Sequence, residues 1–265
     1  MIESLPHECD AFSRDGYVIV RGLLSAEEVS RLSAIARADK ALAESTYGRQ
    51  DASGLPVTLA VRNELRDDLY STIVRSRRIV DRMTAYLDDE VYHWHHKLIL
   101  KEPRVGGAWE WHQDYGYWYH NACLRPDLAS CLIAIDRATK ANGCLQVLKG
   151  THHLGRIDHG KTGDQTGADM TRVNIAMERH ELVHVELEPG DAVLFHSNLL
   201  HRSDQNRSDD PRWALICCYN TRTNDPWQET RHPRYSPLEA CDDSRVTAIA
   251  ERDYTAMMAT FAPQA

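Results

Sequence analysis

The sequence predicts a mainly β protein, a β-sandwich or jelly roll supported by helices. From Glu90 the pattern changes from helical to strand-like, because residues 91–100 alternate with a period of two. Short strand-like segments follow at regular spacing, with turn signals such as Asn142-Gly143 between them. No helical segment separates consecutive strands, which disfavours a parallel α/β sheet. The later predicted strands lie at about 107–114, 129–136, 143–148, 182–187, 191–196 and 212–220.

The N-terminal third has a helical pattern. After a short predicted strand at 16–22, Ser25 and Glu28 form a capping box that predicts a helix to about Glu44. A second helical stretch is predicted at about 64–87. Because no repeat or linker-like stretch interrupts the chain, we predict a single domain over residues 1–265. Its parts are a helical buttress at about 1–88, a jelly-roll core at about 89–225 and a C-terminal helical segment at about 240–262.

Composition narrows the class of protein. Hydrophobic residues make up 42% and charged residues 26% of the 265 positions, which is enough apolar material for a core. The formal net charge of -8 argues against a nucleic-acid partner. No apolar run approaches the roughly 18 residues of a membrane span, and the polar N-terminus does not resemble a secretory signal. We therefore expect a soluble cytoplasmic protein, a monomer or homodimer, without a membrane partner.

Histidine is the unusual component of the sequence. The 14 histidines concentrate in four stretches, whereas the seven cysteines contain no Cys-x-x-Cys pair and signal neither a disulfide framework nor a thiolate zinc site. One His-x-Asp pair occurs, His112 and Asp114, but roughly one is expected by chance in a chain of this composition. The functional reading therefore depends on what surrounds this pair. The histidine-rich stretches are 93–96, 112–120, 152–159 and 180–201.

A third metal ligand from a later strand would complete a face of two histidines and one carboxylate. That face suits non-haem Fe(II), because it leaves coordination positions open for a co-substrate and O2. His201 is the favoured third ligand, and His196 is the alternative. Arg212 follows His201 at a spacing of eleven residues, although it could instead pair with the acidic residues at 209–210.

Beyond these residues, the stretch from about Glu90 to Asp225 resembles the phytanoyl-CoA dioxygenase family of Fe(II)- and 2-oxoglutarate-dependent oxygenases, which includes ectoine hydroxylase. The resemblance covers about half of the chain, and it implies a double-stranded β-helix, a cupin-like jelly roll with flanking helices. The motifs that carry it are Trp-Glu-Trp-His-Gln-Asp-Tyr-Gly-Tyr-Trp at 109–118, Asn-Gly-Cys-Leu-Gln-Val-Leu-Lys-Gly-Thr-His at 142–152, Pro-Gly-Asp-Ala-Val-Leu-Phe at 189–195, His-Arg-Ser at 201–203 and Arg212.

The resemblance implies a role for individual residues. Iron would be bound by His112, Asp114 and His201. Arg212 would pair with the distal carboxylate of 2-oxoglutarate, since a guanidinium can engage a carboxylate through two hydrogen bonds. Other 2-oxoglutarate contacts implied by the matching positions are Ser203, Trp118, Lys97 and His95. The aromatic stretch supplies packing residues by default, and the expected members of the substrate pocket are Trp109, Gln113, Tyr115 and Tyr117.

The activity implied by the resemblance is hydroxylation of an unactivated C–H bond in a small molecule, with release of succinate and CO2. With Asp114 in the carboxylate position, a halide-binding variant of the site is disfavoured. An aromatic and histidine-rich wall favours a polar metabolite over a long acyl chain. The alternative is a jelly-roll protein that binds metal without catalysis or acts as a hydrolase. In the C-terminal segment, three arginines either recognise an anionic substrate or lie on the solvated surface: Arg222, Arg231 and Arg234.

Overall fold

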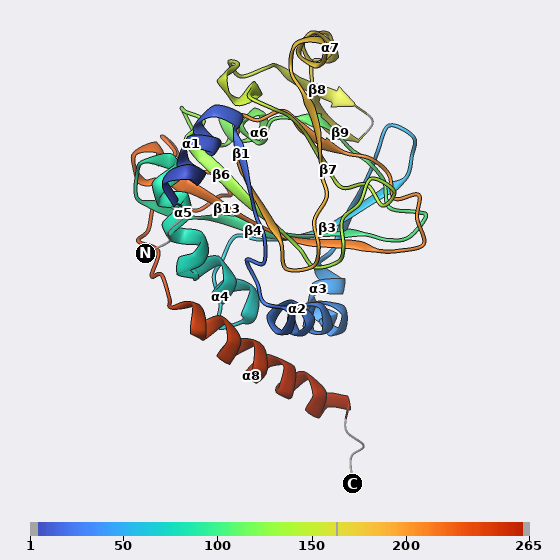
Figure 1. Cartoon of the computed structure of the whole chain (residues 1–265), viewed down its shortest axis with the longest axis vertical. Coiled ribbons are helices and arrows are strands. Elements are labelled where there is room, and N and C mark those ends of the chain that lie inside the picture. The colour runs from blue at the N-terminus through green and yellow to red at the C-terminus, as the bar shows by residue number, and fades with distance from the viewer. Residues whose placement is uncertain (1–4, 163, 262–265) are drawn as a thin grey trace.

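The computed structural model describes residues 5–162 and 164–261, which form two antiparallel sheets, with most of the helices packed on the outer face of the larger one (Figure 1). The larger sheet has seven strands in the order β1-β11-β6-β13-β4-β3-β2, and the smaller has four in the order β10-β7-β12-β5. The large sheet consists of β1 (Tyr17–Val20), β2 (Tyr47–Gln50), β3 (Pro56–Arg62), β4 (Val91–Lys101), β6 (Leu128–Ala134), β11 (Ala192–His196) and β13 (Arg212–Thr221). The small sheet consists of β5 (Trp109–His112), β7 (Leu145–Leu148), β10 (Leu182–Val185) and β12 (His201–Ser203).

A separate hairpin and eight α-helices complete the described chain. The hairpin is formed by β8 (His159–Thr162) and β9 (Gln165–Ala168). The helices are α1 (Leu5–Asp15), α2 (Ala26–Ala38), α3 (Lys40–Ser45), α4 (Leu69–Arg75), α5 (Arg77–Leu87), α6 (Asp114–Trp118), α7 (Met170–Arg179) and α8 (Asp243–Phe261). Short 3-10 turns occur at Tyr119–Asn121, Thr151–His153 and Arg222–Asn224. None of the helices within residues 5–162 and 164–261 has the length and apolarity needed to cross a membrane.

The large sheet is the middle layer of the molecule, with a separate apolar core on each of its faces. On β6, Cys131 and Ile133 pack into the core shared with the helices. The residues that alternate with them, Leu132 and Ala134, pack into the core shared with the small sheet. This period of two is the expected property of a strand buried on both faces. Every second side chain of such a strand therefore faces the space between the two sheets.

The two long predicted helices are each divided in two. The stretch expected to be helical to about Glu44 ends as α2 at Ala38, with Asp39 in an extended conformation before α3. The stretch expected at 64–87 is divided at Ser76, whose extended backbone separates α4 from α5. The hydroxyl of Ser76 donates to the carbonyl of Ile73, a local bond that competes with helix continuation.

The sequence pattern also missed strands and a helix. The strand expected at 16–22 is present as β1, but the rest of the N-terminal segment, expected to be a helical buttress, also contributes the unpredicted strands β2 and β3 to the large sheet. Residues 152–180, to which the sequence pattern assigned neither strand nor helix, contain the β8–β9 hairpin and α7. β2 has a polar and mostly exposed sequence, Tyr-Gly-Arg-Gln, so its strand conformation depends on pairing with β3 rather than on its own pattern.

A β-bulge changes which β4 side chains face the space between the sheets. His95 pairs with Cys218 of β13, while His93 pairs with the next residue, Tyr219, so Trp94 is the extra residue. A bulge shifts the alternation by one position. As a result, Tyr92 and Trp94 before the bulge and His95 and Lys97 after it all face the space between the sheets, which a strict period of two would not predict.

Candidate metal and co-substrate site

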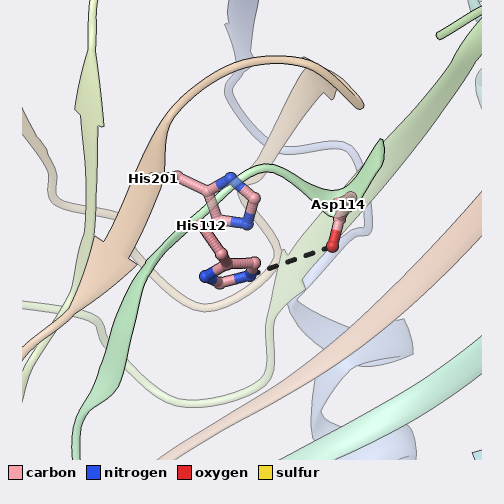
Figure 2. A group of neighbouring side chains, drawn as sticks. All are labelled: His112, Asp114 and His201. Carbon is pink, nitrogen blue, oxygen red and sulfur yellow. Dashed lines mark ion pairs between the residues drawn. The ribbon is translucent and has the colours of Figure 1, made fainter. Parts of the chain in front are cut away.

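Three residues with metal-ligating side chains meet in the space between the sheets. His112 ends β5, Asp114 begins α6, and His201 begins β12 directly opposite His112 in the strand register. Their ligand atoms all lie within 4.8 Å of one another, and all three residues are buried. Figure 2 shows the two imidazoles and the carboxylate converging, with His112 Nε2 3.9 Å from Asp114 Oδ1. Among the described residues, this is the one such group of three.

Asp114 reaches this position through a change of secondary structure. The predicted strand at 107–114 in fact ends at His112, and Gln113 is an extended residue that precedes helix α6. Asp114 is therefore in the first turn of a helix rather than two positions along a strand. The sequence reasoning brought His112 and Asp114 together correctly, but through the wrong local geometry.

Hydrogen bonds fix the tautomer of both histidines. His112 donates from Nδ1 to the carbonyl of Glu110 at 2.6 Å, and His201 donates from Nδ1 to the carbonyl of Leu199 at 2.9 Å. Since a carbonyl oxygen only accepts, the proton of each neutral ring lies on Nδ1 and the Nε2 lone pair is free. Burial lowers the pKa of both rings below the ordinary histidine value, which favours this neutral form.

The carboxylate of Asp114 is oriented in the same way. Ser130 donates from Oγ to Asp114 Oδ2 at 3.0 Å, which leaves Oδ1 on the side of the imidazoles. The donor set is thus two imidazole nitrogens and one carboxylate oxygen, each held by a hydrogen bond to its other polar atom. This set fits Fe(II) with coordination positions left open for a co-substrate and O2.

Arg212, the first residue of β13, supplies a buried positive charge in the same cavity. Its side chain is 3% exposed, its Nε has no hydrogen-bond partner, and it forms no ion pair with any of the described residues. The alternative partner Asp209 instead pairs with Arg104. Burial lowers the pKa of Arg212 to about 10, so the guanidinium remains charged at neutral pH. A buried, unpaired guanidinium is suited to bind the carboxylate of a ligand.

Lys101 is a buried neighbour of Arg212 that the sequence analysis missed. It is the register partner of Arg212 on β4, and it donates from Nζ to Ser203 Oγ at 3.0 Å and to the carbonyl of Asp204. Because Nζ is the donor in this contact, the hydroxyl proton of Ser203 stays available for a ligand carboxylate. Burial and the charge of Arg212 lower the pKa of Lys101. The sequence feature that could have indicated Lys101 is the period of two through residues 95, 97 and 99, which extends to 101.

The cavity that contains these groups has a volume of about 280 Å³ and is lined by both sheets. Most of the residues expected at the site line it, namely His95, Lys97, Trp109, His112, Asp114, Tyr117, Trp118, His201, Ser203 and Arg212. Gln113 and Tyr115, expected in the substrate pocket, are not among the lining residues. Gln113 is fully buried and donates from Nε2 to the carbonyl of Asn198, and the Tyr115 hydroxyl donates to the carbonyl of Leu124.

Several lining residues come from segments that no motif marked. They belong to the β2–β3 hairpin and to stretches after α6 and β13, and they include Tyr47, Arg49, Asn63, Asn121, Arg231 and His232. His232 is stacked on Trp94 with ring centroids 4.4 Å apart. Of the three C-terminal arginines, Arg231 lines the cavity, whereas Arg222 and Arg234 form ion pairs elsewhere.

Polar atoms without protein partners also border this cavity. Nδ1 of His95, Nδ1 of His232 and Nε1 of Trp109 are buried and have no hydrogen-bond partner. Burial lowers the pKa of His95 well below its usual value and that of His232 to about 4, so both rings are neutral near pH 7. Buried polar groups are rarely left unpaired in a completed structure.

Comparison with known proteins gives the family of the chain. Residues 12–214 match the family model described as Phytanoyl-CoA dioxygenase (PhyH). The chain is 29% identical over 204 residues to an L-proline trans-4-hydroxylase from Streptomyces griseoviridis, covering 71% of this chain and 74% of that protein. It is 26% identical over 229 residues to an ectoine dioxygenase from Sphingopyxis alaskensis, covering 81% and 75% of the two chains.

Solved structures share the fold. EctD from S. alaskensis, crystallised with 2-oxoglutarate and 5-hydroxyectoine, has a TM-score of 0.76 at 23% identity and covers 91% of this chain and 89% of its own. The epimerase SnoN, in complex with Fe3+ and alpha ketoglutarate, has a TM-score of 0.71 at 21% identity, with coverage of 90% and 94%. The predicted jelly-roll fold is thus confirmed. The chain belongs to the phytanoyl-CoA dioxygenase family, and the predicted class, a non-haem iron and 2-oxoglutarate-dependent dioxygenase, is confirmed with it.

Proposed function

We propose that this protein binds Fe(II) through His112, Asp114 and His201 and hydroxylates a C–H bond of a small polar substrate, with 2-oxoglutarate converted to succinate and CO2. The observation that carries the proposal is the buried group of three ligand atoms within 4.8 Å, beside the unpaired guanidinium of Arg212. A non-catalytic metal site would have no use for a buried arginine that lacks a protein partner.

In this proposal some residues bind 2-oxoglutarate directly and others orient the residues that bind it. Arg212 and the hydroxyl of Ser203 hold the distal carboxylate of 2-oxoglutarate, and Lys101 orients that hydroxyl. When bound, Fe(II) and 2-oxoglutarate supply the chemistry by which O2 is activated and one oxygen atom is transferred to substrate. The aromatic wall formed by buried Trp118 and half-buried Trp109 and Tyr117 limits access of water to this region.

Two further predicted contacts, His95 and Lys97, are assigned in this proposal to the end of 2-oxoglutarate that chelates the metal. His95 and Lys97 line the cavity on β4, and we propose that one or both contact the C1 carboxylate of 2-oxoglutarate. Lys97 forms no ion pair with any residue that the structure describes, so its charge is free to act on a ligand. A cation there would favour an anionic group near the metal.

Cavity size and charge support a small polar substrate. A volume of about 280 Å³ lies just below the usual range for small-molecule pockets, about 300–1,000 Å³. The lining cations Arg49 and Arg231 are not paired with acidic side chains among the described residues. Two relatives are named for amino-acid-like substrates, L-proline and ectoine. We therefore propose a small metabolite that carries a carboxylate rather than a long acyl chain.

The test is an anaerobic titration of the metal-free protein with Fe(II) and 2-oxoglutarate. We expect the weak visible charge-transfer band of a chelated 2-oxo acid, followed by slow succinate formation when O2 is admitted. Small carboxylated metabolites are then screened for faster succinate formation, and the product is analysed for an oxygen atom derived from labelled O2. Iron binding without the band or succinate would favour a non-oxygenase metal protein. A product without the label would favour a reaction that transfers no oxygen atom to the substrate, since SnoN, with the same fold, is an epimerase.

A further inference from the structure

The peptide group between two of the ligands is held by a histidine from a distant segment. Gln113 stands between His112 and Asp114, and its backbone N–H donates to Nε2 of His159 at 3.0 Å. His159 begins β8, so the contact spans 46 residues of sequence. The hydrogen bond acts on the main chain through which the two ligands are connected.

Only one protonation state of His159 is compatible with its contacts. Nδ1 lies 2.7 Å from the carbonyl of Ile157, which only accepts, so Nδ1 carries the proton. Nε2 then has the lone pair that the Gln113 N–H requires. The neutral Nδ1–H tautomer satisfies both contacts, and the nitrogen that accepts from the peptide is not available to bind a metal.

The ring of His159 is also held by close packing. A Cβ atom at Gly116 would lie 2.2 Å from Cε1 and 2.3 Å from Nε2 of His159, so a side chain at position 116 would displace the imidazole. The Gln113 side chain ties the same two segments together, because its Oε1 accepts from the N–H of Ile157 at 2.8 Å. Residues 113–116 and 157–159 are therefore joined by reciprocal hydrogen bonds and by direct contact.

We propose that His159 is a positioning residue of the metal site, a neutral hydrogen-bond acceptor that fixes the peptide between His112 and Asp114 and so sets the relative orientation of these two ligands. The inference rests on the proposed function, since it presupposes that these residues bind a metal. Tyr117 belongs to the same arrangement: its ring lies between His112 and His159, and its hydroxyl donates to the carbonyl of Thr166. The β8–β9 hairpin is thereby part of the support of the metal centre.

The chain offers a matched control for simple loosening of the hairpin. Gln165, at the start of β9, accepts from the N–H of Glu110 at 3.2 Å and donates to the carbonyl of Ala108 at 2.8 Å. These bonds attach the hairpin to β5 through the two peptide groups that flank Trp109, not through the carbonyl of Glu110 that accepts from His112 or the peptide that joins His112 to Gln113. Gln165→Leu should therefore disturb hairpin docking while leaving the Gln113–His159 bond in place.

The experiment compares the full-length parent with His159→Leu, His159→Gln and Gln165→Leu. Co(II) serves as the metal probe, and its Kd and visible absorption spectrum are measured together with the Tm of the metal-free proteins. We expect His159→Leu to raise the Kd for Co(II) about 10- to 100-fold and to alter the spectrum, as is typical when a residue supporting a ligand is lost. His159→Gln keeps an acceptor near the position of Nε2 and should stay within about 3-fold of the parent. Gln165→Leu should lower Tm but keep the parent spectrum and affinity.

Three outcomes would overturn the proposal. They are unchanged Co(II) affinity in His159→Leu, an equal loss in Gln165→Leu, and no rescue by His159→Gln. If His159→Leu does not fold, Gly116→Ala provides the second perturbation, because its methyl group displaces the ring, and retained parent affinity there would equally reject the idea. Asp114→Ala separates the two proposals: if it leaves Co(II) binding of the parent unchanged, the metal site itself is misassigned, whereas loss of binding shows that the His159 results concern positioning.

Discussion

Replacing Arg212 by Met should affect stability and co-substrate binding in opposite directions. The guanidinium is buried, its Nε has no partner, and it forms no ion pair with a described residue. Leaving a buried polar group unsatisfied costs about 1–3 kcal/mol. A methionine of similar length removes that cost, so the metal-free variant should unfold at a Tm higher by about 2–4 °C for each kcal/mol gained.

Binding of 2-oxoglutarate should weaken in the same variant, by an amount at least comparable to the stability gain. Truncating one partner of a buried, hydrogen-bonded charge pair costs about 2–5 kcal/mol. The lower limit alone corresponds to about a 30-fold increase in Kd. Ser203 and Lys101 remain in place in the variant, so the loss is assigned to the bidentate contact of the arginine.

The assay is an anaerobic titration with 2-oxoglutarate at saturating Fe(II), together with thermal unfolding of the metal-free protein. Arg234→Met is the matched control, because it removes an arginine that is paired with Asp225 away from the cavity. We expect the control to keep the parent Kd. An unchanged Kd in Arg212→Met would reject the co-substrate role, and a lower Tm would show that the guanidinium instead supports the fold.

Three further predictions address the ligands, their support and the acid response. Asp114→Ala should abolish both retention of Fe(II) after desalting and succinate formation, and full succinate production would exclude the carboxylate from the site. Ser130→Ala removes the hydrogen bond to Asp114 Oδ2 and should raise the Kd for Fe(II) about 10-fold or more, measured by competition with a chelator; equal affinity would show that Ser130 does not orient the ligand. Burial and the nearby Arg62 and Arg66 lower the pKa of His96 to about 3 in the folded protein. The unfolded chain therefore takes up this proton at a higher pH than the folded one. Because of this difference, the free energy of unfolding decreases as pH falls below about 6.5. Urea unfolding of the metal-free protein at pH 7 and pH 5 should show His96→Leu losing about 2 kcal/mol less than the parent over this interval, and equal losses would contradict the assignment.

The three possible metal ligands could be predicted from the sequence because their positions depend on short separations and on simple spacings along the chain. His112 and Asp114 are separated by one residue, and any short connection keeps them close. His201 could be chosen over His196 because Ser203 and Arg212 follow it at the expected spacings. In the structure, His201 lies opposite His112, while His196 accepts a hydrogen bond from the N–H of Asn198 outside the group of three.

The remaining walls of the cavity could not be predicted in this way. Arg49 and Arg231 reach the cavity only because the β2–β3 hairpin and the C-terminal segment fold over it, and neither segment has a motif. The residues that hold the ligands in place could not be predicted from the sequence either. Ser130 and His159 each act through a single hydrogen bond to a segment far away in the sequence. Gln113 is a residue that the sequence analysis expected in the substrate pocket and that does not line the cavity. Its place beside two ligands suggested a pocket residue, but its amide is fully buried in bonds to neighbouring loops.

The register of β12 links the two ends of the co-substrate site. His201 and Ser203 are two residues apart, so they project from the same face of the strand at a separation of about 6.6 Å. On the neighbouring β5, the same interval is matched by His112 and Trp109, which are three residues apart, so the pairing includes a bulge. This irregularity keeps His201 opposite His112 while Ser203 remains bonded to Lys101, the register partner of Arg212. A one-residue slip of β12 would turn both side chains away from the cavity. The short strand therefore sets the spacing between His201, in the group of three possible metal ligands, and Ser203, the hydroxyl that we propose binds the distal carboxylate of 2-oxoglutarate together with Arg212.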